Sequence, residues 1–170
     1  MSYFQHFAKC VLPPAAVWNW TQKELLIPAI EMSKMQCHVR IAKPVSNLVQ
    51  TQQMYCAGLG LSVVGHFENH EGFDGVMLGS AGMSYHFEFT HCNDHIIKPA
   101  TTVEDLVVFY EADHEIWSDM CQNMIDAGFQ QVTSFNPYWE INGRTFQDND
   151  GYRIVLQNGG WENMTASDIA

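Results

Sequence analysis

Ionisable side chains recur at every second position in two short stretches of the chain. His38 and Arg40 alternate with valine and isoleucine, and within residues 85–89 His86 and Glu88 alternate with aromatic residues. A period of two is typical of a half-buried strand, so the apolar side chains would enter the core and the four ionisable ones would share the opposite face. Two imidazoles and a carboxylate could hold a divalent metal ion. With the guanidinium, the same groups could instead form a cluster that hydrogen-bonds an organic ligand.

Residues 152–157 repeat this alternation near the end of the chain. Every second residue there is aromatic or aliphatic, which leaves Arg153, Val155 and a glutamine for the other face. We therefore expect polar side chains from three strands to converge on one concave surface. Arg40 or Arg153 would then pair with Glu88, because a guanidinium strongly favours the charged form of a neighbouring carboxyl group.

The stretches that carry these side chains belong to an internal duplication. Residues 38–90 and 105–158 each predict a strand, a helix that ends at an Ala-Gly pair, and three short strands separated by glycine-containing turns. Aligning the two closing strands places Glu88 opposite Val155. The pattern predicts an α+β fold in which two βαβββ units join edge to edge as a paired mixed sheet that encloses a cleft.

The element boundaries follow from this duplication. We expect Ser46 to cap the first helix and Gly58 to end it, and we expect a second helix from about His114 to Ala127. Asn142-Gly143 and Asp150-Gly151 indicate hairpin turns. The predicted organisation is an N-terminal arm with a short helix, a first unit, a linker, a second unit and a C-terminal tail, over residues 1–36, 37–92, 93–103, 104–160 and 161–170.

This order of elements resembles the vicinal oxygen chelate superfamily, which includes glyoxalase I, bleomycin-resistance proteins and extradiol dioxygenases. The resemblance covers residues 38–158 and rests on His38 at the start of the first strand, the segment FEFT that contains Glu88, and the closing segment DNDGYRIVLQN. In metal-dependent members of the family, each half supplies one ligand from its first strand and one carboxylate from its fourth strand. His38 and Glu88 match these two positions in the first half.

In the second half the correspondence is incomplete. The carboxylate position falls on Val155, which cannot bind a cation, and the first-strand position falls within residues 105–108, where only Asp105 could coordinate. A catalytic divalent metal normally takes three protein ligands. The two matched residues of the first half are too few, so His86 would have to be a third ligand for Fe, Mn, Ni or Zn.

Two further motifs could contribute to a site. Tyr138 and Trp139 follow Pro137, which excludes them from a central strand. On a loop or an edge they would either stack on a flat or cationic ligand, or cover the core or a dimer interface. The linker segment HCNDH (91–95) resembles a metal clip, but it has no second pair of ligands nearby in the sequence, and we expect no metal there.

The chain is strongly acidic, with 19 Asp and Glu against 8 Lys and Arg and a formal net charge of −11. Such a surface would repel nucleic acid, whose binding depends on cations that neutralise phosphates. No basic residue occurs between Lys98 and Arg144. This interval could attract a cationic molecule or partner, or it could be an ordinary solvated helix face.

No apolar run approaches the roughly 20 residues that cross a bilayer, and the N-terminal segment lacks the pattern of a signal peptide. The five cysteines are scattered and contain no CxxC pair, which favours reduced thiols. We therefore expect a cytoplasmic protein that does not bind membranes.

These observations favour a metal-free binding protein of the glyoxalase/bleomycin-resistance type, with a small cationic or aromatic ligand held between the two units. The predicted ligand contacts are polar for His38, Arg40, His86, Glu88 and Arg153, and stacking for Tyr138 and Trp139. The alternative is a lyase, isomerase or dioxygenase whose divalent metal is bound by His38, Glu88 and a third ligand. A third hypothesis is an interaction module whose acidic second half binds a basic partner. The family resemblance and the apolar N-terminal arm also predict a homodimer.

Overall fold

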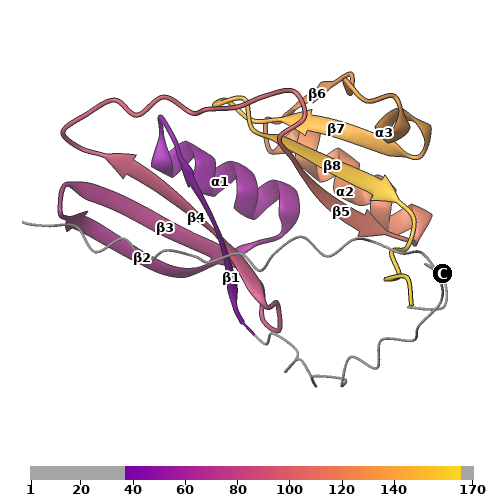
Figure 1. Ribbon diagram of the computed structural model, residues 1–170, viewed down its shortest axis with the longest axis horizontal. Helices are drawn as coiled ribbons and strands as arrows, with labels where there is room; N and C mark the ends of the chain where they lie inside the picture. The colour runs from indigo at the N-terminus through magenta and orange to yellow at the C-terminus, as the bar shows by residue number, and fades with distance from the viewer. Residues whose placement is uncertain (1–36, 166–170) are drawn as a thin grey trace, which may run out of the picture. The chain divides into compact units, whose positions relative to one another are not determined.

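The computed structural model describes residues 37–165, which contain two βαβββ units (Figure 1). The first unit consists of β1 (Val39–Pro44), α1 (Leu48–Leu59), β2 (Ser62–His70), β3 (Phe73–Gly79) and β4 (Tyr85–Cys92). The second consists of β5 (Leu106–Glu111), α2 (His114–Asp126), β6 (Gln130–Val132), the short helix α3 (Tyr138–Ile141), β7 (Gly143–Gln147) and β8 (Arg153–Asn158). The α+β class and the duplication are confirmed. The predicted N-terminal arm lies outside the described residues.

Each unit contains its own four-stranded mixed sheet. The strand orders are β1-β4-β3-β2 and β5-β8-β7-β6, and in both sheets the first pair is parallel and the others are antiparallel. Arg40 pairs with His86 on β1 and β4, and Leu106 pairs with Arg153 at the equivalent place on β5 and β8. Within residues 37–165 the ladders stay inside each sheet. The two units are therefore joined by side-chain and helix contacts.

The helices begin at asparagine and aspartate caps. Asn47, and not Ser46, caps α1, because its side chain accepts a hydrogen bond from the Gln50 N–H at 3.0 Å. The α2 helix begins after Asp113, whose side chain accepts from the first-turn N–H groups. No helix in this part of the chain is long and apolar enough to cross a membrane.

The predicted end of the first helix was wrong. The α1 helix continues through Gly58 to Leu59 and is capped by Gly60, whose φ of 65° lies in the left-handed region that glycine favours. Gly58 serves the packing of the two helices, because a Cβ added there would stand 2.9 Å from Met124 Sδ on α2. Similarly, Asn142-Gly143 is not a hairpin turn, since it joins α3 to β7.

The helices and the inner faces of both sheets bury a single hydrophobic cluster. Phe89 of β4 and Leu156 of β8, both predicted to point inward, have exposed fractions of 0% and 1%. Tyr55 of α1 reaches the second unit, where its ring centroid lies 5.2 Å from that of Phe129. Because α1 and α2 also pack against each other, the two units share one core.

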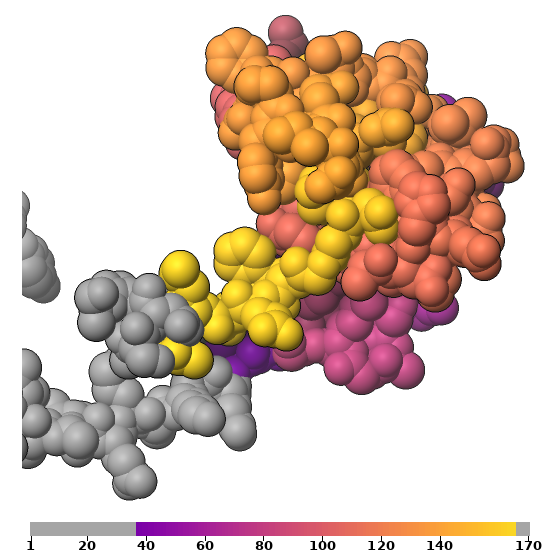
Figure 2. Space-filling model, turned by 90° about the vertical axis from the view of Figure 1, so that its right-hand side faces the viewer, coloured from indigo at the N-terminus to yellow at the C-terminus, as the bar shows by residue number. Residues whose placement is uncertain are grey.

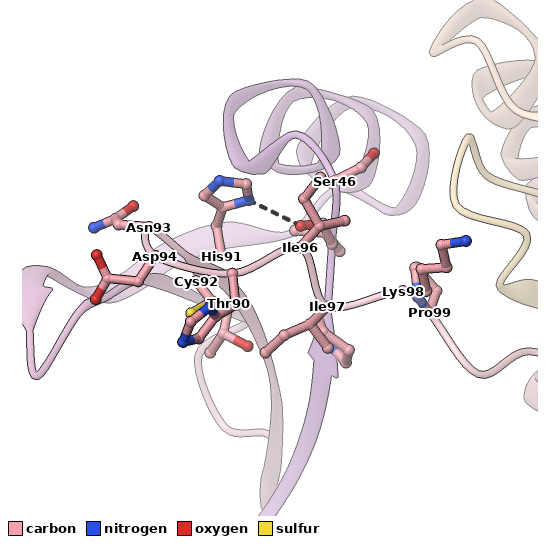
Figure 3. Close-up of a pocket in the computed structure, with 13 residues that line it drawn as sticks. Ser46, Thr90, His91, Cys92, Asn93, Asp94, Ile96, Ile97, Lys98 and Pro99 are labelled. Atoms are coloured by element: carbon pink, nitrogen blue, oxygen red, sulfur yellow. Dashed lines mark hydrogen bonds between the residues drawn. The ribbon is translucent and has the colours of Figure 1, made fainter.

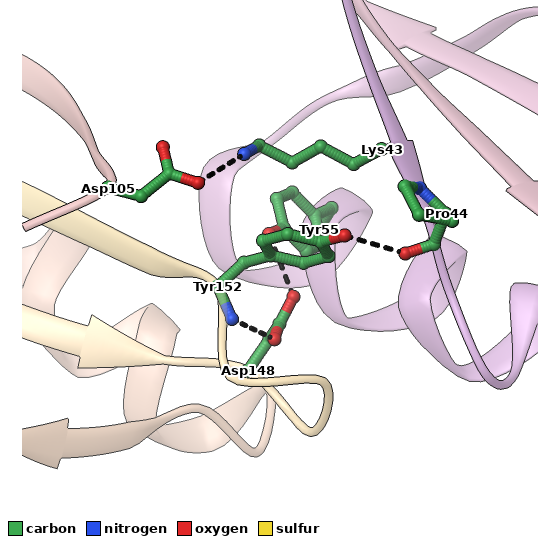
Figure 4. A network of polar contacts seen from close by, with 6 residues as sticks. All are labelled: Lys43, Pro44, Tyr55, Asp105, Asp148 and Tyr152. Carbon is green, nitrogen blue, oxygen red and sulfur yellow. Dashed lines mark hydrogen bonds and ion pairs between the residues drawn. The ribbon is translucent and has the colours of Figure 1, made fainter. Parts of the chain in front are cut away.

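A buried carboxylate joins the second unit to the first (Figure 4). Asp148 accepts hydrogen bonds from the Tyr55 hydroxyl at 3.0 Å and from the Tyr152 N–H at 2.8 Å. The Tyr152 hydroxyl donates to the Pro44 carbonyl at 2.8 Å, and Lys43 Nζ lies 4.4 Å from the centre of the Tyr152 ring. These contacts tie the turn between β7 and β8 to α1 and to the end of β1.

Two further contacts reinforce this joint. The Ser46 N–H donates to Asp150 Oδ2 at 3.0 Å, and Lys43 Nζ lies 3.5 Å from Asp105 Oδ2. The predicted Asp150-Gly151 turn is confirmed, with a φ of 90° at the glycine. Asp105, the one residue within 105–108 that could coordinate a metal, is thus paired with a lysine.

Burial and neighbouring carboxylates raise the pKa of both tyrosines at the joint. Burial, followed by Asp148, Asp150 and Asp105, raises the pKa of Tyr152 from 10.0 to about 12. The pKa of Tyr55 is also raised, first by burial and then by Asp148. A phenol whose pKa is raised by folding stabilises the fold fully below its unfolded-state pKa, and that contribution is lost as the pH rises through the folded-state pKa.

We predict that Tyr152→Phe lowers the free energy of unfolding by about 1 kcal/mol near neutral pH, because the hydrogen bond to Pro44 is lost. The difference from wild type should shrink as the pH rises from 10 toward about 12, where the wild-type phenol ionises. Urea unfolding across this range measures both effects. Tyr138→Phe is the matched control, since Tyr138 is 52% exposed. A Tyr152→Phe difference that stays constant with pH would contradict the explanation.

Candidate functional site

Four ionisable side chains on the outer face of the first sheet form one connected group, which we term the polar cluster: His38, Arg40, His86 and Glu88. His38 Nε2 lies 2.5 Å from His86 Nδ1. Arg40 Nε donates to His86 Nε2 at 3.0 Å, and Arg40 Nη1 lies 2.5 Å from Glu88 Oε2. The strand register brings them together, since Arg40 is opposite His86 and Glu88 follows two residues along β4. The predicted convergence of these four residues is confirmed.

The protonation states follow from the direction of these hydrogen bonds. A guanidinium can only donate, so His86 Nε2 must accept and the His86 proton must reside on Nδ1. That proton is donated to His38 Nε2, which places the His38 proton on Nδ1. Burial lowers the pKa of His86, and His38 and Arg40 lower it further against the opposing effect of Glu88. Both imidazoles are therefore neutral in this arrangement.

Glu88 is the buried end of the polar cluster. Its side chain is 12% exposed, whereas that of Arg40 is 52% exposed. The contact between Arg40 Nη1 and Glu88 Oε2 is close enough for an ion pair but lacks hydrogen-bond geometry, so this buried oxygen has no hydrogen-bond donor. Arg40 Nη1 covers this oxygen, but a carboxylate has about four acceptor sites, so Glu88 can still accept a hydrogen bond from a ligand.

The second sheet does not supply the expected partner for Glu88. Arg153 Nε donates to Gln147 Oε1 at 3.1 Å, and its Nη1 donates to the Val103 carbonyl at 3.3 Å. These bonds hold the Arg153 guanidinium to β7 and to the linker that precedes β5. Of the two arginines considered from the sequence, Arg40 is the one that pairs with Glu88.

The face of the second sheet that was expected to be open is covered. Val155 is fully buried although it points away from the shared core. Its neighbour on β7, Thr145, is hydrogen-bonded to the Ser134 hydroxyl, and the Ser134 N–H donates to Glu140 Oε1 at 2.7 Å. This backbone donor lowers the pKa of Glu140. The segment from Ser134 to α3 therefore lies across this face. No periodic sequence pattern marks Ser134 or Glu140 for this role.

Tyr138 and Trp139 belong to this covering segment. They form α3 after Pro137 and contact each other, with ring centroids 4.8 Å apart and nearly perpendicular planes. Figure 2 shows the segment (orange) at the surface of the second unit, where Tyr138 is 52% and Ile141 73% exposed. The two rings contact each other within the second unit, and their stacking on a ligand stays a prediction.

The arrangement of the polar cluster does not suit the metal site of the family. Within residues 37–165, no three His, Cys, Asp or Glu side chains are grouped so that they could hold a metal ion. His38 and His86 direct ring nitrogens at each other, and Glu88 faces a cation. In the linker, His91 Nδ1 lies 3.1 Å from the Val45 carbonyl oxygen. The side chains that could have bound a metal are thus engaged in contacts within the protein.

Two family models match the chain, each over one unit. The model described as the YycE-like N-terminal domain matches residues 39–90, and the model described as the YycE-like C-terminal domain matches residues 104–158. The chain is also 38% identical over 120 residues to "Uncharacterized protein YycE" of Bacillus subtilis (strain 168), which covers 71% of this chain and 86% of that protein.

Solved structures agree with these family matches. A YycE protein from Bacillus subtilis is 34% identical with a TM-score of 0.69, covering 77% of this chain and 94% of that one. The fosfomycin resistance protein FosX from Mesorhizobium loti is 11% identical with a TM-score of 0.56, covering 71% and 90%. Glyoxalase I from Leishmania major is 17% identical with a TM-score of 0.56, covering 72% and 86%. At these two lower identities the likeness shows the fold alone.

We predict that Gly143→Ala destabilises the protein by about 1–3 kcal/mol, as overpacking does in well-packed sites. A Cβ at this position would stand 2.5 Å from the carbonyl oxygen of Trp139 and 2.7 Å from Gln157 Oε1, and the backbone of the covering segment cannot yield without moving α3. Gly160→Ala is the control, because no atom lies within 4 Å of its added Cβ. Equal melting temperatures for the two variants would show that the covering segment is loosely held.

Proposed function

The chain belongs to the YycE-like family of the glyoxalase/fosfomycin-resistance (vicinal oxygen chelate) superfamily, and we propose that it binds a small organic molecule at the polar cluster without a metal ion. The observation that carries this proposal is the ion pair between Arg40 and Glu88. Metal-dependent members of the superfamily have a ligand carboxylate at the Glu88 position, and here that carboxylate faces a guanidinium.

The accessibility of the polar cluster supports binding from solvent. His38 and Arg40 are exposed at the outer end, and Glu88 is buried at the inner end, where its carboxylate has acceptor sites that Arg40 does not use. A ligand could therefore receive hydrogen bonds from the exposed groups and donate one to Glu88. A molecule with both a hydrogen-bond donor and an acceptor meets these requirements. Contacts of that ligand with Arg153, Tyr138 and Trp139 stay predictions.

The alternative function is a metal-dependent lyase, isomerase or dioxygenase. Its support is the short distance between His38 Nε2 and His86 Nδ1, two nitrogen atoms that could turn toward a shared cation. Against it, Val155 occupies the carboxylate position of the second half and is fully buried. A metal ion would also have to displace Arg40 from both His86 and Glu88.

We predict that Glu88→Gln weakens ligand binding and lowers the free energy of unfolding by about 1–3 kcal/mol, since the Arg40 guanidinium loses its counter-charge. The effect on stability should fall near the lower end of this range, because Arg40 is half exposed and water can solvate it. Chemical denaturation measures the change. Glu162→Gln, in the exposed C-terminal tail, is the control. A fully stable Glu88→Gln variant would contradict a structural role for the ion pair.

We also predict that the purified protein carries less than one tightly bound transition metal per chain and melts at the same temperature with EDTA as with Mn, Fe, Ni or Zn. A ligand that binds only the folded state raises the melting temperature by mass action, so a specific metal would be visible in this assay. Elemental analysis supplies the stoichiometry. Stoichiometric metal that is lost in His38→Ala and Glu88→Ala would favour the enzyme.

A further inference from the structure

A pocket of about 430 Å³ opens where β1 and β4 end (Figure 3). Its volume lies within the roughly 300–1,000 Å³ of small-molecule sites. One side is formed by the end of β1 and by Ser46, and the other by the end of β4 and the linker that follows it. Figure 3 shows this linker running from Cys92 past Ser46 to Lys98 and Pro99. The pocket is therefore built on the first unit and its linker.

Much of the pocket wall is apolar. Pro44, Val45, Ile96, Ile97 and Pro99 line it, with Thr90 as a small polar group on the strand side. Ile97 remains 42% exposed. An apolar group placed in the pocket would remove such aliphatic surface from water, which favours binding in proportion to the area covered.

The pocket continues the face that carries the polar cluster. His86, Glu88 and Thr90 occupy alternate positions on β4, so their side chains leave the same face of the sheet. Glu88 and Thr90 are two residues apart, which is about 7 Å along a strand. One small molecule can therefore contact Glu88 at one end and the linker pocket at the other.

The polar cluster also restricts the chemistry of the group that it would hold. The charges of Arg40 and Glu88 cancel, and both histidines are neutral in this arrangement. N–H groups of His38 and Arg40 remain at the exposed end, and the Glu88 carboxylate has acceptor sites that Arg40 does not use. A neutral group with both a donor and an acceptor, such as a carboxamide, complements this set. A bare anion or cation would match only half of it.

From these observations we propose that the ligand is an amphipathic molecule whose neutral carboxamide-like head binds the polar cluster and whose apolar chain fills the pocket beneath the linker of residues 93–99. This inference rests on the proposed function and adds the class of ligand and a second subsite. The linker between the duplicated units becomes part of the binding site.

The test uses acetamide, butanamide and hexanamide as probes, titrated into the full-length protein and followed by NMR. Each added methylene should strengthen binding about fourfold while the chain enters the pocket. Hexanoate and hexylammonium should bind more weakly than hexanamide. Glu88→Gln should weaken all three amides by the same factor and leave the gain per methylene unchanged.

Ile97→Asp should abolish the gain per methylene, because it places a carboxylate in the apolar wall. Ile141→Asp is the matched control, since Ile141 is 73% exposed on α3 and does not line the pocket. If Ile97→Asp unfolds, Ile97→Ala should still reduce the gain per methylene. If the affinity of the Ile97 variants still rises with each methylene, the alkyl chain binds elsewhere and the inference is overturned.

The remaining outcomes separate this inference from the proposed function. If the amides bind with no dependence on chain length, the ligand class is overturned and the polar cluster remains a binding site. The same conclusion follows if hexanoate binds more tightly than hexanamide and its binding is still weakened by Glu88→Gln. Failure of every probe to bind, together with stoichiometric metal in the purified protein, would overturn both.

Discussion

The buried carboxylate of Asp148 is the constraint on which the rest of the described fold depends. Asp148 is 6% exposed, and burial raises its pKa although Tyr55 and two backbone N–H groups donate to it. A charge held away from water requires those donors, and moving the turn between β7 and β8 away from α1 would remove the Tyr55 hydroxyl from Asp148. Through Tyr152 the same turn holds the end of β1. Because β1 carries Arg40 and directly follows His38, this joint also supports the strand on which the polar cluster is built.

The duplication produces two units of similar topology whose outer faces differ. In the first unit, the outer face presents an arginine, two histidines and a glutamate in mutual contact. In the second unit, Val155 and Thr145 take the corresponding face, and the segment leading into α3 closes it. One face can therefore receive a ligand and the other contributes to stability. This difference is why membership of the superfamily establishes the fold and leaves the chemistry to be argued from individual residues.

The sequence predicted those features that depend on local periodicity. Alternation placed His38, Arg40, His86 and Glu88 on one face, and the repeat predicted both sheets. Prediction from the sequence failed where contacts between distant segments determine the structure. Gly58 was read as a helix end, but its small size serves packing against Met124. The alternation allows Arg153 beside Glu88, yet Arg153 bonds to Gln147 and to the linker carbonyl of Val103. The covering segment and the linker pocket have no periodic signature, so only the folded chain reveals them.

The most direct test of the central claim, a metal-free polar cluster, is the long-range ¹H–¹⁵N NMR spectrum of the imidazole rings before and after addition of Zn(II). We expect a neutral His86 with its proton on Nδ1 and an accepting Nε2, and a spectrum that Zn(II) leaves unchanged. Joint movement of the His38 and His86 nitrogen signals to metal-bound values, in the wild type and not in Glu88→Gln, would contradict it.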